Sequence, residues 1–180
     1  MNPEPKLIER CQKRDPKALE ELYKMYSPSM YGVCLRYVKD KEDARDLLHD
    51  GFIKVMDNLG SFSNSGSFEG WIRRIMVHVA INFYRRHITR RMDSEISITD
   101  ALENNSVDVI SQMSAQELMM HVQSLPHGYR IVFNLYAIEG YKHEEIAKML
   151  DISESTSKTQ LMKARRVLMS KIKENAYETV

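Results

Sequence analysis

The chain has 180 residues, of which 43% are hydrophobic, with 26 Lys and Arg against 25 Asp and Glu. This length allows one or two domains, and the nearly balanced charge does not by itself indicate nucleic-acid binding. No apolar run approaches the roughly 20 residues of a membrane-spanning helix. Gly and Pro are few and alternating strand patterns are absent, so the sequence predicts an all-α fold.

The two cysteines, Cys11 and Cys34, fall in apparently helical segments and lack the close spacing of a metal site. No signal-peptide pattern is recognised before them. We therefore expect reduced thiols in a cytoplasmic protein, with no metal or cofactor.

Apolar residues at helical spacing predict a series of helices in the first half of the chain. Asp15 is expected to cap a helix that begins at Pro16, and Asp40 is expected to cap a later one. Residues 59–68 (LGSFSNSGSF) are rich in Ser, Gly and Asn, which is typical of a loop. The expected helices cover residues 6–14, residues 16–25, a segment starting at 27–28, a segment following Asp40, and residues 71–91.

The second half begins with a segment that has no sustained period. Residues 94–114 are acidic and polar, which predicts a flexible linker. Helices are expected over 115–124 and 129–138, with Gly140 ending the second. Two further periodic runs follow, separated only by residues 151–153. A short helix, a turn of this length and a longer helix form a helix-turn-helix, whose second helix enters a DNA major groove.

The second helix of this pair has a basic outer face. From Ser153 to Lys173 there are six Lys and Arg, whereas Glu154 is the one acid. Amide, hydroxyl and cationic side chains bond base edges or phosphates. The alternative interpretation is a helical hairpin with an ordinary solvated basic face. The candidate DNA-binding residues are Ser155, Thr156, Lys158, Thr159, Gln160, Lys163, Arg165 and Arg166.

Charge is distributed unevenly along the chain. Residues 69–91 hold six Arg and one acid, residues 92–121 hold six acids and no Lys or Arg, and the closing helix is basic again. This basic–acidic–basic order suggests two modules that face nucleic acid, joined by an acidic spacer.

Three stretches, in this order, resemble the extracytoplasmic-function (ECF) group of bacterial sigma-70 family factors. DARDLLHDGFIKV (43–55) is similar to region 2.2, SFEGWIRRIMVHVAINFYRR (67–86) to regions 2.3–2.4, and residues 125–168 to region 4. The resemblance covers nearly the whole chain except the linker and the ends. It implies a non-catalytic subunit that binds core RNA polymerase, melts the −10 promoter element with region 2 and reads the −35 element with region 4.

The resemblance also implies a division of the chain and a set of partners. Region 2 is expected over residues 1–92, a flexible acidic linker over 93–114, and region 4 over 115–176, both regions being small helical domains. The implied partners are the β′ clamp helices and the β subunit of core polymerase, and promoter DNA as duplex and as single strand. An anti-sigma factor is a further candidate partner, and no membrane insertion is expected.

In the region 2.2 stretch, the resemblance implies a face that docks on polymerase. Asp46 and Asp50 are four residues apart and share a helix face, with His49 beside them. From the residues alone, a solvated acidic patch is the simpler interpretation. His49 and Asp50 replace the Gln and Glu of the family. The candidate polymerase-binding residues are Asp46, His49, Asp50, Phe52 and Met56.

In regions 2.3–2.4, the resemblance implies that the loop at 62–68 captures a base flipped from the melted −10 strand. Contacts in the pocket and stacking must offset the cost of flipping. The aromatic residues there either stack on this base or pack in the core. His78 stands where many relatives have Asn. The candidate −10 residues are Phe62, Asn64, Ser65, Trp71, Arg73, Arg74, His78, Asn82, Arg85 and Arg86.

Region 4 departs from the common family pattern at several positions. Asp151 stands where Gly often makes the turn, so we expect a left-handed backbone there, at some cost relative to Gly. Lys142 stands where Ser or Thr often caps the helix, a loss of roughly 1 kcal/mol. Ser157 lies one turn before Leu161 on the packed side, which favours a structural role. Gln160 in place of Arg suggests a base preference shifted toward adenine.

Two other functions remain alternatives. A stand-alone helix-turn-helix repressor or activator would use residues 1–91 for dimerisation or effector binding, but the long linker and the acidic patch argue against it. An enzyme would need a site such as His78 with His87, or Cys34 with a His. The sequence shows no nucleophile–base pairing, metal spacing or phosphate-binding glycine loop to support one.

Overall fold

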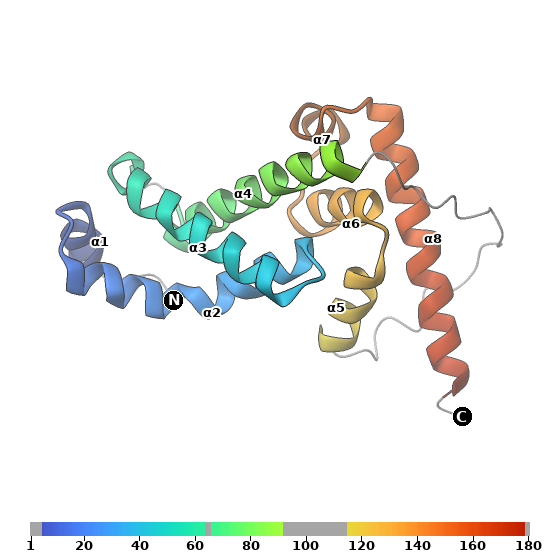
Figure 1. The fold of residues 1–180 in the computed structure, drawn as a ribbon, viewed down its shortest axis with the longest axis horizontal. Helices are drawn as coiled ribbons and strands as arrows, with labels where there is room; N and C mark the ends of the chain where they lie inside the picture. The colour runs from blue at the N-terminus through green and yellow to red at the C-terminus, as the bar shows by residue number, and fades with distance from the viewer. Residues whose placement is uncertain (1–4, 64–65, 92–114, 179–180) are drawn as a thin grey trace. The chain divides into compact units, whose positions relative to one another are not determined.

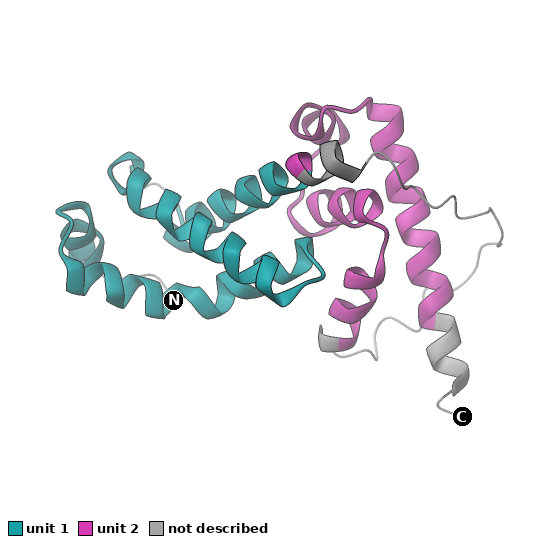
Figure 2. Cartoon of the chain, viewed as in Figure 1, with its two compact units in different colours: residues 1–84 teal, residues 85–180 magenta. Residues whose placement is uncertain are grey.

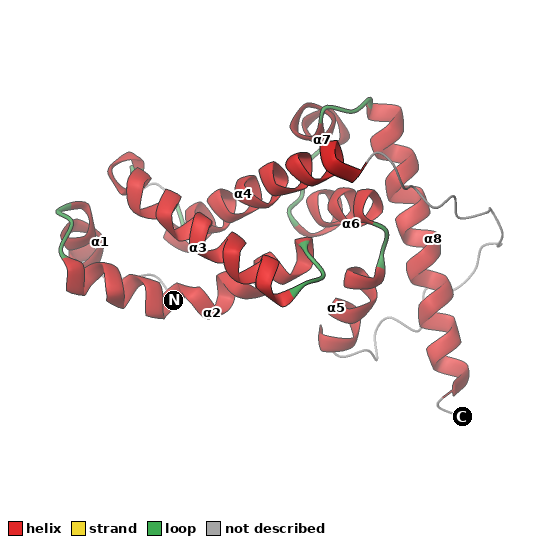
Figure 3. Ribbon diagram, in the orientation of Figure 1, coloured by secondary structure: helices red, strands yellow, loops and turns green. Residues whose placement is uncertain are grey.

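A computed structural model describes residues 5–63, 66–91 and 115–178 of the chain. Every regular element in these ranges is helical, which confirms the predicted all-α fold (Figures 1 and 3). None of these helices is both long enough and apolar enough to cross a membrane. The chain divides into two compact units, Met1–Tyr84 and Arg85–Val180 (Figure 2).

The first unit is a bundle in which α2 packs along α3, and α1 lies against α2 and the turn η1. Asp15 and Asp40 cap two of its helices as predicted. Asp15 Oδ1 accepts the Lys17 N–H at 3.0 Å, and Asp40 Oδ1 accepts the Glu42 N–H at 2.6 Å. The elements are α1 (Pro5–Gln12), α2 (Pro16–Tyr37), α3 (Lys41–Asn58), the 3-10 turn η1 (Leu59–Ser61) and α4 (Phe68–Arg91).

The prediction of a new helix at residues 27–28 is wrong, because α2 continues through Pro28 to Tyr37. A proline inside a helix removes one backbone hydrogen bond and crowds the preceding turn. Tyr26 and Met30, on either side of Pro28, are only 2% and 1% exposed. Burial of both side chains in one core stabilises the continuous helix against the local effect of the proline.

Helix α4 begins three residues earlier than predicted. Ser67 caps it: the Gly70 N–H donates to Ser67 Oγ at 3.2 Å, and the Trp71 N–H donates to the Ser67 carbonyl at 3.0 Å. α4 comes so close to α3 that a Cβ on Gly51 would collide with the thioether of Met76. The contact fixes where the two helices cross, and therefore which faces they leave exposed.

In the second unit, α8 packs against each of the other α-helices. Val122 and Leu125 meet Ala164 and Leu168 in its core. The helix predicted over 129–138 begins two residues earlier and ends in a π-helical turn. The elements are α5 (Ala115–Ser124), α6 (His127–Phe133), the π turn η3 (Asn134–Ile138), α7 (His143–Leu150) and α8 (Glu154–Glu178).

A glycine and a buried arginine fix the ends of these helices. Gly140 has φ 79°, which L residues rarely adopt, and it terminates η3 as predicted. Arg130 is 2% exposed, and its Nη1 donates to the Gln123 carbonyl at 2.9 Å near the end of α5. Burial lowers the pKa of Arg130 to about 10, so the guanidinium stays charged near neutral pH.

Candidate nucleic-acid interface

The predicted helix-turn-helix is present as α7, a tight turn and α8. Asp151 ends α7 in the left-handed conformation, with φ 58° and ψ 48°, as expected for a residue in the place of Gly. The N–H groups of Asp151 and Ile152 both donate to the Ala147 carbonyl. These two bonds satisfy the end of α7 and turn the chain into α8 within three residues.

The start of α7 lacks a side-chain cap from Lys142, as the sequence indicated. The Glu145 carboxylate compensates in part, because its Oε2 accepts the backbone N–H of Lys142 at 2.7 Å. This bond is one half of a capping box. It lets the helix-turn-helix keep a lysine at a position where a hydroxyl residue usually caps.

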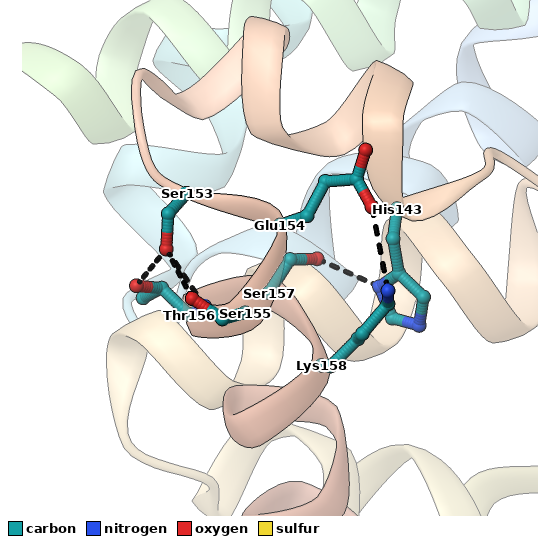
Figure 4. Close-up of polar contacts among 7 residues, drawn as sticks. All are labelled: His143, Ser153, Glu154, Ser155, Thr156, Ser157 and Lys158. Atoms are coloured by element: carbon teal, nitrogen blue, oxygen red, sulfur yellow. Dashed lines mark hydrogen bonds and ion pairs between the residues drawn. The ribbon is translucent and has the colours of Figure 1, made fainter.

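The first turn of α8 carries a cluster of hydroxyl groups (Figure 4). Ser153 Oγ accepts the Thr156 N–H at 3.0 Å and caps the helix. The same oxygen lies 2.8 Å from the hydroxyl oxygens of Ser155 and Thr156. Lys158 Nζ pairs with Glu154 Oε2 at 3.3 Å. A phosphate that contacts Lys158 would therefore compete with Glu154 for its ammonium.

The outer face of α8 divides into exposed and packed residues. Gln160 is half-buried, and its amide nitrogen lies 3.2 Å from the position of a Cβ on Gly128. Its Oε1 is buried and accepts no hydrogen bond among the described residues. Lys163 is also half-buried. The exposed candidates on this helix are Ser155, Thr156, Lys158, Thr159, Arg165 and Arg166.

Helix α4 presents a second set of candidates as one stripe. Trp71, Arg74, His78 and Asn82 recur at spacings of three and four residues, which places them on the same side of the helix. Arg74, His78 and Asn82 are exposed and Trp71 is half-buried. Arg85 and Arg86 are exposed at the end of the stripe, whereas Arg73 is half-buried beside it.

The loop before α4 is closed by an aromatic cluster. The rings of Phe62 and Phe68 meet edge-to-face at 4.9 Å, and Trp71 lies 5.5 Å from each. Phe62 and Phe68 are buried, so they pack in the core and join the two ends of the loop. Gly66 has φ 89°, a conformation that favours glycine. Asn64 and Ser65 lie outside the described residues.

The polymerase-binding candidates of α3 separate into exposed and packed residues. Asp46, His49 and Asp50 are all exposed on one side of the helix. Phe52 is only 2% exposed and its ring packs on Tyr23 at 4.6 Å between centroids. Met56 is half-buried. These two apolar residues therefore support α3 from within the bundle.

Two residues that sequence reasoning did not select belong to these surfaces. Ile53 is 49% exposed and follows Asp46 and Asp50 on the same side of α3, at i+7 and i+3. The sequence could have identified Ile53 by its helical spacing from these two carboxylates, since an exposed apolar residue at such a place often marks a binding surface. Lys54 of α3 is also exposed and lies near His78 of α4. The pKa of His78 is lowered by desolvation and by the nearby cations Arg74 and Lys54. Lys54 therefore extends the cationic stripe of α4, a relationship that only the tertiary fold reveals.

Both cysteines of the chain lie in the core of the first unit. Cys11 and Cys34 are both buried free thiols, and burial raises the pKa of Cys34 to about 12. Among the described side chains, no group of three or more His, Cys, Asp or Glu is placed to hold a metal ion.

Each half of the chain matches a known protein family. The family description Sigma-70 region 2 matches residues 22–90, and Sigma-70, region 4 matches residues 115–168. The chain belongs to the sigma-70 family. Together the two matches cover more than half of the sequence and leave the predicted linker between them.

Full-length relatives place this sigma factor in the ECF group. It is 27% identical over 173 residues to the RNA polymerase sigma-H factor of Pseudomonas aeruginosa, covering 90% of both chains. It is 28% identical over 177 residues to the ECF RNA polymerase sigma-E factor of Escherichia coli (strain K12), covering 92% of both. The protein is thus an RNA polymerase sigma factor, a transcription initiation factor.

A solved structure shows the same fold. The sigma factor RpoE from Bartonella quintana, solved in complex with the anti-sigma factor NepR, matches with a TM-score of 0.51 at 17% identity. The match covers 87% of this chain and 98% of that chain.

Proposed function

We propose that this sigma factor is a non-catalytic subunit that binds core RNA polymerase and directs it to promoters. Region 2, over residues 1–92, melts the −10 element, and region 4, over 115–176, reads the −35 element as duplex. The observation that supports this most is the division of the first unit into an acidic exposed face on α3 and a cationic stripe on α4. The first suits a basic protein surface and the second suits a nucleic-acid strand.

The polymerase-docking face consists of Asp46, His49, Asp50 and Ile53. Two carboxylates steer and orient the encounter with a basic partner such as the β′ clamp helices. The exposed side chain of Ile53 supplies apolar area that becomes buried on binding. Phe52 and Met56 act indirectly, because they hold α3 in the bundle.

The −10 element is held by the stripe of α4 and the loop before it. Arg74, Arg85 and Arg86, with Arg73 beside them, contact the phosphates of the separated strand, and His78 and Asn82 contact sugars or bases. Trp71, half-exposed at the base of the loop, stacks on a base, while Phe62 keeps the loop closed. Asn64 and Ser65 bond the edge of the flipped base.

The −35 element is read by the first turns of α8. Lys158, Lys163, Arg165 and Arg166 contact phosphates or guanine edges, and the hydroxyls of Ser155, Thr156 and Thr159 contact either. Gln160 reads a base only if its amide leaves Gly128, so we assign it a smaller part than the exposed cations.

This sigma factor acts in the cytoplasm without a cofactor. The acidic linker predicted over residues 93–114 lies outside the described residues and would join the two regions. An anti-sigma factor is a candidate partner because the similar Bartonella protein was solved with one. Such an inhibitor would have to cover the docking face of α3 or the outer face of α8.

The test is binding of the purified chain to bacterial core polymerase, with Asp46→Ala compared against Glu20→Ala. Glu20 is also an exposed carboxylate, on α2, and is paired with Lys24. We expect Asp46→Ala to weaken binding about tenfold with the fold intact, and Glu20→Ala to leave it unchanged. Failure of the wild-type chain to bind core polymerase, together with tight binding to promoter duplex alone, would favour a stand-alone regulator.

A further inference from the structure

A buried hydroxyl connects the two helices of the helix-turn-helix. Ser157 of α8 is fully buried, and its Oγ lies 2.9 Å from Nδ1 of His143, the first residue of α7 (Figure 4). A buried polar group is costly to leave without a partner. The pair therefore sets the position of the His143 ring against the second turn of α8.

An aromatic stack continues outward from that pair. The ring of Tyr136, in the π turn η3, stacks on His143 with 4.5 Å between centroids and 23° between planes. On Tyr136 lies the guanidinium of Arg165, with Cζ 5.8 Å from the centroid of its ring. Four side chains from three elements thus form a continuous series, from the buried Ser157 to the exposed Arg165.

We propose that His143 and Tyr136 are positioning residues that hold Arg165 ready for a DNA phosphate. This inference rests on the proposed role of α8 as the DNA-contacting helix. A long arginine side chain loses conformational freedom when it binds, and a side chain ordered beforehand loses less. A guanidinium over an aromatic face is attracted by the ring quadrupole and keeps its N–H donors free at the edge.

The charges around the stack fit this role. Desolvation lowers the pKa of His143, and the nearby cations Lys158 and Arg165 lower it further, while Glu154 opposes them. Near neutral pH the imidazole is therefore uncharged, so it supports Tyr136 without repelling the arginine above it.

The alternative is that the stack only stabilises the second unit. The two roles differ in how mutations combine. If Tyr136 acts through Arg165, removing the ring has no further effect on DNA binding once Arg165 is gone, because coupled residues are not additive. If Tyr136 only stabilises the fold, its effect is the same whether or not Arg165 is present.

The experiment measures binding of the full chain to a mixed-sequence 30-base-pair duplex at low salt, with helicity and thermal unfolding checked for each variant. We expect Tyr136→Leu to weaken binding about two- to fivefold, as for loss of an exposed cation–π contact. Tyr136→Phe, which keeps the ring, is the matched control and binds like wild type. In the Arg165→Ala background, Tyr136→Leu has no further effect.

Three results would overturn the inference: wild-type affinity for Tyr136→Leu, an equal loss for Tyr136→Leu with and without Arg165, or no measurable duplex binding by the wild-type chain at low salt. Transcription with core polymerase tests the proposed function separately. Suppose that the variants bind duplex as expected but core polymerase makes no transcripts that depend on the chain. The proposed function is then wrong, whereas the role of the stack in positioning Arg165 for DNA still holds.

Discussion

The amide of Gln160 lies against Gly128, with its nitrogen 3.2 Å from the position that a Cβ on residue 128 would take. Its Oε1 is buried on the same side. Contact with a base would require Gln160 to leave this packing, whereas the ammonium of Lys158 only exchanges one carboxylate partner for a phosphate.

We therefore expect Gln160→Ala to change duplex affinity and base preference little, whereas Lys158→Ala weakens binding roughly tenfold and lowers the salt slope by about 1. A salt titration with promoter duplex measures both quantities, and selection from a randomised duplex pool measures base preference. A clear shift of base preference in Gln160→Ala would show that the glutamine does leave Gly128 in the complex.

The close crossing of α3 and α4 at Gly51 predicts that one added methyl group destabilises the first unit. Gly51→Ala pushes a Cβ against Sδ and Cε of Met76, the far end of a flexible side chain that is buried and has to shift. We therefore expect a cost of about 1 kcal/mol of unfolding free energy, at the lower end of the range for overpacking. Gly32→Ala is the control, because Gly32 lies inside α2 and nothing is within 4 Å of its Cβ position. That change should stabilise by about 0.5–1 kcal/mol. Urea unfolding distinguishes the two, and equal effects would contradict the described crossing.

The exposed isoleucine on the acidic face of α3 predicts a selective loss of polymerase binding. Ile53→Ala removes apolar area that is exposed in the free protein, so stability should change by less than about 0.5 kcal/mol. Affinity for core polymerase should fall roughly tenfold, the size typical of a central interface residue. Met25→Ala, at a comparably exposed apolar residue on α2, is the control. Equal binding by both variants would place Ile53 outside the interface.

The lowered pKa of His143 predicts a pH dependence of stability. The unfolded chain protonates this imidazole at its ordinary value near 6.5, about the middle of the physiological range, whereas the folded protein protonates it at lower pH. The neutral imidazole therefore contributes its full share of the unfolding free energy above pH 6.5, and this share is lost as the pH falls below that value. His143→Gln does not titrate, so its urea midpoint should fall less than that of wild type between pH 7.5 and 5.5. Parallel shifts in the two proteins would contradict the assignment.

Burial of Cys34 predicts an unreactive thiol. Because its pKa is about 12, only about one molecule in ten thousand carries the thiolate at pH 8, and the sulfur is shielded from solvent. Iodoacetamide should modify Cys34 only after denaturation in urea, as peptide mass mapping would show. Rapid alkylation of the folded protein would mean that α2 opens readily.

The sequence predicted most helices because their signals are local. Asp15 and Asp40 cap as expected, and Asp151 makes the left-handed turn, since each depends on one residue and its immediate neighbours. The helix start predicted at Pro28 is wrong because burial of its neighbours in the core outweighs the local effect of the proline on the helix. No local sequence pattern shows that burial.

The sequence named the site residues but did not decide which of them are exposed, because exposure depends on tertiary packing. Phe52 pairs with Tyr23, and Gln160 with Gly128, both far away in the sequence. Arg74 and His78 were predicted as separate candidates, and the structure places them on one stripe with Lys54 near His78. The series from Ser157 to Arg165 likewise depends on η3, whose π geometry has no signature in the sequence.

The most direct test of the central claim is run-off transcription with purified chain, bacterial core polymerase and promoter fragments from the source genome. The account predicts new transcripts that start at defined promoters, require the chain and decline strongly with Asp46→Ala or Lys158→Ala. Absence of any chain-dependent transcript, under conditions in which the chain is folded and core polymerase is active with another sigma factor, would contradict it.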